Sequence, residues 1–165
     1  MNWVKNFSKD SVVDQDANIL SMHVSEDNEW LFMSNELGYI KQFNHRTHKF
    51  EKSWGQVMGG QINRIIGMYG MLYVSDSKSE YSNGPVGNVR VFNMKDGKMI
   101  KDVEALIPAG ILDMILIPGN GPPGWKDRLI LAGADRVVYE FDGYHQRELV
   151  TWPERWSGDI TAIVM

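Results

Sequence analysis

Two histidines lie at a spacing that metal sites use. His45 and His48 form an HxxH pair, which could direct two imidazole nitrogens toward one ion. A metal site needs at least one further ligand, and Glu51 is the carboxylate that lies close to the pair in the sequence. We therefore interpret the pair as the hydrated tip of a turn between two strands, and we expect no metal site.

Carboxylates and glycine clusters form the second group of candidates. Asp76, Asp135 and Arg136 are residue types that can carry out acid–base chemistry. Their spacing, however, matches no Ser-His-Asp triad, and it gives no reason to expect a pair of carboxylates whose pKa values are shifted. The glycine clusters at 59–60 and 119–121 do not open a helix, so they lack the row of N–H groups that binds phosphate. We expect turns at these clusters, no catalytic residue and no cofactor.

The elements that must position these residues repeat along the chain. Phe43, Phe92 and Phe141 each precede Asn or Asp, and they follow one another at intervals of 49 residues. Self-similarity at a fixed period of roughly 20–50 residues is the mark of a repeat architecture. The same interval of 49 residues connects Ile62 with Ile111 and Ile160, and Trp54 with Val103 and Trp152.

Each repeat holds four short segments rich in Ile, Val, Phe, Tyr and Trp, separated by turn residues. No stretch of about ten residues has the apolar period of a helix. The sequence therefore predicts an all-β chain of four-stranded antiparallel blades in a β-propeller array. The expected strands are 19–24, 30–33, 39–44, 50–54, 62–68, 72–74, 88–93, 99–103, 111–117, 129–132, 137–142 and 147–152. The expected blades are 19–54, 62–103 and 111–152, in a single array over 1–165, with the outer strand and loop of a preceding blade at 1–18 and the first strand of a following blade at 160–165.

Two segments carry a resemblance to a known family. Segment 87–98 reads Gly-Asn-Val-Arg-Val-Phe-Asn-Met-Lys-Asp-Gly-Lys and resembles the third strand and following turn of a WD40 repeat. Segment 38–44 is a second copy, and the copy that ends at Phe141 is looser. Phe stands where the family has Trp, and the Gly-His pair before the first strand lacks its His. The chain is thus similar to a divergent WD40-like propeller, which implies a rigid, non-catalytic scaffold for protein–protein interaction in a larger assembly.

The number of blades leads to a further expectation. Three whole blades are fewer than the about four to eight of a closed propeller. In a homodimer, each blade formed where the end of one copy meets the start of the other would still lack two strands, so a dimer would not close the propeller. We expect the chain to be a piece of a longer propeller, or to complete its array of sheets on a partner chain.

The composition of the chain excludes several classes of function. The 165 residues carry a net charge of −4 and no cysteine, which argues against nucleic-acid binding and excludes disulfides and thiolate metal sites. No run of about 18 apolar residues exists, so we expect no membrane insertion. Residues 1–20 show no apolar core of signal-peptide length, which favours an intracellular and cytoplasmic location.

The candidate binding residues lie in loops. We expect one face to hold Tyr81, Arg136, Arg155 and Trp156, whose aromatic and guanidinium groups are the types that dominate protein interfaces. Trp125, on the opposite face, is the second choice. The sequence thus favours an interaction scaffold with one or more protein partners. A small-molecule-binding, carbohydrate-binding or hydrolytic propeller is the alternative.

Overall fold

The fold is all-β, as the sequence predicts. The computed structural model describes residues 17–78, 86–119, 127–142 and 148–152, together with 157, 158, 160, 162 and 163. These residues form three four-stranded antiparallel sheets and contain no helix.

Each sheet is a meander whose strands pair in chain order. The first sheet contains β1 (Ile19–Val24), β2 (Trp30–Asn35), β3 (Tyr39–Asn44) and β4 (Lys49–Gln56). The second contains β5 (Gln61–Met68), β6 (Met71–Lys78), β7 (Val86–Asn93) and β8 (Met99–Ile107). The third contains β9 (Ile111–Ile117), β10 (Arg128–Gly133), β11 (Val138–Asp142) and β12 (Glu148–Thr151). The outer strand expected within 1–18 and the first strand expected at 160–165 lie only in part within the described residues, and Ile160, Ala162 and Ile163 have no strand assignment.

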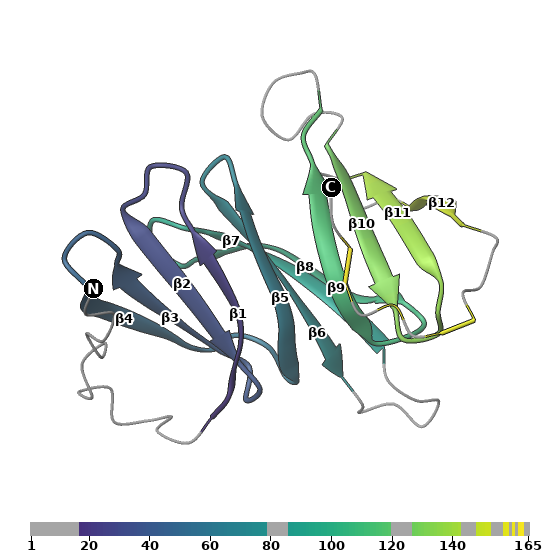
Figure 1. The fold of residues 1–165 in the computed structure, drawn as a ribbon, viewed down its shortest axis with the longest axis horizontal. Helices are drawn as coiled ribbons and strands as arrows, with labels where there is room; N and C mark the ends of the chain where they lie inside the picture. Colours follow the sequence, from purple (N-terminus) through teal and green to yellow (C-terminus); the bar gives the residue numbers. More distant parts are fainter. Residues whose placement is uncertain are drawn as a thin grey trace.

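The three sheets stand side by side, with the second between the other two (Figure 1). The first strands of neighbouring sheets are in contact, β1 with β5 and β5 with β9. This is the arrangement of propeller blades, in which the first strand of each blade lies nearest the axis.

A β-bulge recurs in the first strand of every sheet. The pairing register shifts at Leu20 in β1, at Asn63 in β5 and at Leu112 in β9. A bulge adds one unpaired residue and increases the local twist of the strand. The repeat in the sequence is therefore also a repeat in strand geometry.

The residues that follow the bulges in β1 and β5 contact the first strand of the next sheet, and the residue that follows the bulge in β9 contacts Ile163. The Ser21 hydroxyl oxygen accepts a hydrogen bond from the Ile65 backbone N–H at 3.1 Å. The Asp113 carboxylate accepts one from the Ile163 N–H at 2.7 Å, and Arg64 forms an ion pair with Asp113 at 3.2 Å. Ile65 and Ile163 are 98 residues apart, which is two repeat intervals. Ile163 therefore has the same position relative to the third sheet as Ile65 has relative to the first sheet.

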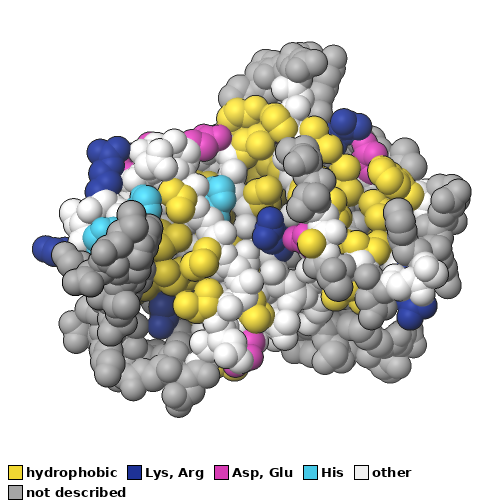
Figure 2. Space-filling model, viewed as in Figure 1, with side chains coloured by type: hydrophobic (Ala, Val, Ile, Leu, Met, Phe, Trp, Pro, Cys, Tyr) yellow, Lys and Arg dark blue, Asp and Glu magenta, His cyan; other side chains and the backbone are white. Residues whose placement is uncertain are grey.

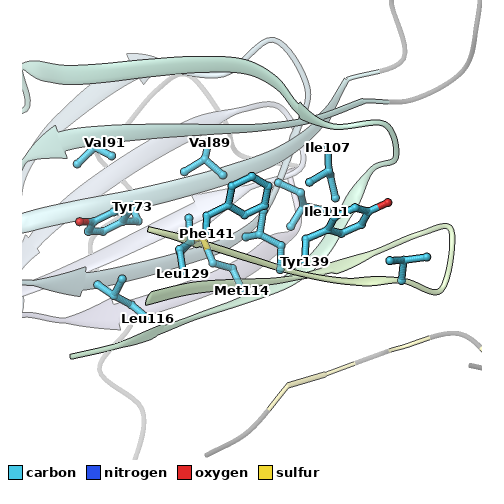
Figure 3. Close-up of a cluster of buried hydrophobic side chains, with 12 residues drawn as sticks. Tyr73, Val89, Val91, Ile107, Ile111, Met114, Leu116, Leu129, Tyr139 and Phe141 are labelled. Carbon is cyan, nitrogen blue, oxygen red and sulfur yellow. The ribbon is translucent and has the colours of Figure 1, made fainter. Parts of the chain in front are cut away.

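Apolar side chains fill the space between the second and third sheets. Figure 3 shows side chains from both sheets that point toward one another. This cluster of buried residues comprises Tyr73, Val89, Val91, Ile107, Ile111, Met114, Leu116, Leu129, Leu131, Val137, Tyr139 and Phe141. Burying one side chain of this kind stabilises the fold by about 1.5–3 kcal/mol, so this interface is a large share of the total stability.

Trp54 joins the first sheet to the second. Its ring lies edge-on to Phe32 at 5.3 Å and tilted against Phe92, on the second sheet, at 5.8 Å. Its indole N–H donates to the buried Gln42 amide oxygen at 3.1 Å. Gly97 lies directly against the indole, where an added Cβ would lie 3.1 Å from two ring atoms, closer than ordinary van der Waals contact.

The outer face of the first sheet is apolar and exposed. Met22 has the same pairing position as Ile65 and Met114, the residues that follow the bulge by two in the other sheets. Ile65 and Met114 are buried, whereas Met22 is 60% exposed. Hydrophobic side chains accordingly gather over the first sheet in Figure 2.

We predict that Trp54→Ala destabilises the protein by about 2–3 kcal/mol, because it removes two aromatic contacts and leaves Gln42 buried without its partner. Trp152 occupies the same position in the repeat but is 43% exposed, so Trp152→Ala should cost less than about 1 kcal/mol. Urea denaturation at pH 7.5 measures both variants. Equal losses would show that Trp54 does not join the sheets.

Candidate interaction surface

A groove lies at one end of the sheets, where the turns of the first two sheets meet. Its volume is about 630 Å³, within the range of ligand-binding pockets. The tips of the β1–β2 and β5–β6 hairpins lie at the same upper edge in Figure 1. The groove is lined by Ser25, Glu26, Asp27, Glu29, Trp30, Tyr69, Gly70, Met71, Asn93, Met94 and Lys95.

The β1–β2 turn forms the first wall. Ser25 is buried, and its hydroxyl donates to Asp27 Oδ1 at 2.5 Å and accepts from the Trp30 N–H at 2.9 Å. The same Asp27 oxygen accepts from the Glu29 N–H at 2.9 Å. The Ser25 hydroxyl and then the Glu29 amide lower the pKa of the Asp27 carboxyl, so this exposed group stays ionised. The turn therefore holds a fixed negative charge at the rim.

The β5–β6 hairpin forms the second wall and has an unusual residue at its tip. Met68 pairs with Met71, and the two residues between them, Tyr69 and Gly70, have φ angles of 53° and 72°. A two-residue hairpin loop of this kind requires positive φ at both positions and favours Asn or Asp followed by Gly. A bulky residue at positive φ is an outlier. The Tyr69 side chain is 37% exposed, so this costly conformation places an aromatic ring at the groove.

The β7–β8 turn closes the groove. Met94 is buried, and its N–H donates to the Gly70 carbonyl at 2.9 Å, which ties this turn to the β5–β6 hairpin. Asn93 accepts from the Lys95 N–H at 2.9 Å through its side-chain oxygen. Lys95 is the one cation among the residues that line the groove, opposite Glu26, Asp27 and Glu29. The lining of the groove is therefore net acidic.

His23 lies between the first two sheets near this groove. Gly67 of β5 approaches the imidazole so closely that an added Cβ would collide with it. Burial lowers the pKa of His23; Glu26 acts in the opposite direction, and Arg64 adds to the lowering. The buried Nε2 atom of His23 has no hydrogen-bond partner.

Arg136 is the one sequence-predicted binding residue that the structure describes. It is exposed in the β10–β11 turn, with φ at 68°, and its N–H donates to the Gly133 carbonyl at 3.0 Å. The other four lie outside the described residues: Tyr81, Trp125, Arg155 and Trp156. That these five residues form interaction faces stays a prediction.

The carboxylates considered for chemistry hold loops in place. Asp76 is buried and accepts hydrogen bonds from the Asn88 amide at 2.7 Å and the Gly60 N–H at 3.2 Å. Asp135 accepts from the Tyr139 hydroxyl at 2.5 Å and the Val137 N–H at 3.2 Å. Both carboxylates thus have structural roles in the connections between strands.

The HxxH pair lies in the β3–β4 turn, as the sequence predicts. The two imidazole rings are 6.4 Å apart. Within the described part of the chain, no three His, Cys, Asp or Glu side chains come close enough together to hold a metal ion.

Known proteins resemble this chain in fold. No family model and no curated protein sequence matches it. The crystal structure of the computationally designed Ika4 protein matches 91% of this chain and 81% of its own, with a TM-score of 0.68 at 12% identity. The RRP9 WD40 repeats match 82% of this chain and 38% of their own, with a TM-score of 0.64 at 10% identity. The U3-55K structure matches 83% and 39%, with the same score and identity.

These likenesses show the fold alone, because the identities are low. The chain has a WD40-like β-propeller fold of four-stranded antiparallel blades. It spans about two fifths of the length of the RRP9 and U3-55K structures. The residues that the structure describes include no helix with the length and hydrophobicity needed to span a bilayer.

Acidification should weaken the fold through His23. Its pKa is lower in the folded chain than the ordinary value of about 6.5, so the unfolded chain binds a proton first as the pH falls. The stability that neutral His23 provides is present above pH about 6.5 and is lost as the pH falls toward the folded-state pKa. The Tm measured between pH 7.5 and 5.0 should therefore decline less for His23→Phe than for the wild type.

The matched control is His48→Asn, which removes an exposed imidazole from a position with φ at 57° that suits Asn. Its Tm should follow the wild-type pH dependence. A decline for His23→Phe as steep as that of the wild type would assign the acid sensitivity to other groups.

Proposed function

We propose that this chain is a protein-interaction module, a rigid propeller scaffold without catalytic activity that acts in a larger assembly. The observation that carries the proposal is the groove between the first two sheets, which turn residues form around an exposed aromatic side chain and three carboxylates. Aromatic and charged groups in a concave surface are typical of sites that bind a partner. The WD40-like fold is consistent with this role but does not establish it.

The loop face expected from the sequence is a second surface in the same proposal. Arg136 is exposed in the β10–β11 turn, at the end of the sheets opposite the groove. We expect Tyr81, Arg155 and Trp156 to join Arg136 on that face, with Trp125 on the opposite face as the second choice. Aromatic and Arg side chains in such connections would provide the anchors of a protein interface.

Other parts of the proposal concern assembly and location. The exposed apolar face of β1 and the position of Ile163 on the third sheet both fit an array that further blades extend, from the same chain or a partner chain. The proposal includes an intracellular, cytoplasmic location, and the net charge of −4 argues against a nucleic-acid partner. A propeller that binds or hydrolyses a small molecule or carbohydrate is the alternative.

We predict that Tyr81→Ala and Trp156→Ala each weaken capture of the protein partner from native extract, by roughly 1–3 kcal/mol in binding, with little change in Tm. Quantitative affinity capture followed by titration with the purified partner measures the effect. Lost stability with unchanged affinity would make these side chains part of the packing. If no protein is captured and a metabolite raises the Tm, the alternative function is correct.

A further inference from the structure

We propose that the groove between the β1–β2 turn and the β5–β6 hairpin binds a cationic peptide segment of a partner protein, one in which Arg or Lys alternates with apolar residues. This inference rests on the proposed interaction function and specifies the chemistry of one partner. It concerns the end of the sheets opposite Arg136.

Charge is the first reason for a cationic occupant. Glu26, Asp27 and Glu29 line the groove, and Lys95 is the one basic residue among the described residues that line it. Arg46 lies beside this lining and donates to the Asp27 carbonyl at 3.1 Å. The hydrogen bonds from the Ser25 hydroxyl and the Glu29 N–H keep Asp27 in place and ionised. A partner with Arg or Lys side chains would neutralise this excess of negative charge, whereas an acidic segment would be repelled.

The aromatic residue at the hairpin tip is the second and independent reason. Tyr69 has a φ of 53°, where Asn would cost less, yet its ring stands at the groove and is 37% exposed. Residues that the fold holds in an unfavourable backbone conformation are often found at functional sites. Tyr69 and the half-buried Trp30 line the groove, and the faces of aromatic rings attract guanidinium and ammonium groups.

Apolar lining accounts for the apolar residues of the proposed segment. Met94 is buried, lines the groove and belongs to the apolar cluster between the first and second sheets. Met71 lines the groove as well, but it packs against the apolar cluster between the second and third sheets. Methionine side chains adapt their shape and pack against varied apolar groups. A volume of about 630 Å³ admits a few residues of an extended chain, which matches a short linear segment better than a folded surface.

Fluorescence anisotropy with two labelled nine-residue peptides tests the proposal on the full chain. One peptide alternates Arg with Leu, and the other has Glu in place of every Arg. The Arg peptide should bind at least about tenfold more tightly at 0.15 M salt, and its affinity should fall as the salt concentration rises. Equal binding of the two peptides would overturn the proposal.

A charge-matched pair of double variants locates the binding. Glu26→Gln with Glu29→Gln removes two charges from the groove and should weaken binding of the Arg peptide about fivefold. Glu36→Gln with Glu51→Gln removes the same charge from the half-buried Glu36 and the exposed Glu51, which do not line the groove, and it should change the affinity less than twofold. Equal losses would mean that the net charge of the protein, not the groove, attracts the peptide.

Tyr69→Asn separates binding from folding. Asn suits the positive φ, so the Tm should stay the same or rise, while loss of the ring should weaken binding of the Arg peptide about threefold. Unchanged affinity would overturn the role given to the ring. If the Arg peptide fails to bind while Tyr81→Ala or Trp156→Ala still weakens partner capture, this inference falls and the proposed interaction function stands.

Discussion

Face-to-face packing of neighbouring sheets is the constraint on which the rest of the structure depends. Consecutive residues of β6 bury their side chains on opposite sides of the second sheet: Leu72 and Val74 toward the first sheet, and Tyr73 toward the third. All three are at most 1% exposed. A strand that is apolar on both faces is stable in water only when both faces are covered. The second sheet therefore requires both of its neighbours.

This packing leaves the ends of the sheets available for recognition. Contacts from the residues after the bulges, Ser21 with Ile65 and Arg64 with Asp113, fix how neighbouring sheets align. The turns then inherit their positions from the strands, so hairpins from different sheets can build one groove with little reorganisation on binding. Tyr69 shows the consequence, since a rigid hairpin can hold a residue in a conformation that it would rarely adopt alone.

The sequence predicts the strands well because their signal is local. The expected strand 39–44 coincides with β3, whereas the last strand of the second sheet continues past the expected residue 103 to Ile107, which pairs with Gly87 after a register shift. The bulges follow from twist and packing, which composition does not show. The groove was missed because its walls come from three turns far apart in the sequence. The one local sign was Tyr69 before Gly70, where Asn or Asp is usual.

Amide hydrogen exchange measured residue by residue tests the central claim, that the sheets stabilise one another as a single unit. If they do, the amides of β6 in the second sheet and β10 in the third should open together, with protection factors within about tenfold of each other and close to the free energy of global unfolding. Protection that persists in the second sheet after the third has exchanged completely would contradict the account, because each sheet would then be stable without its neighbour.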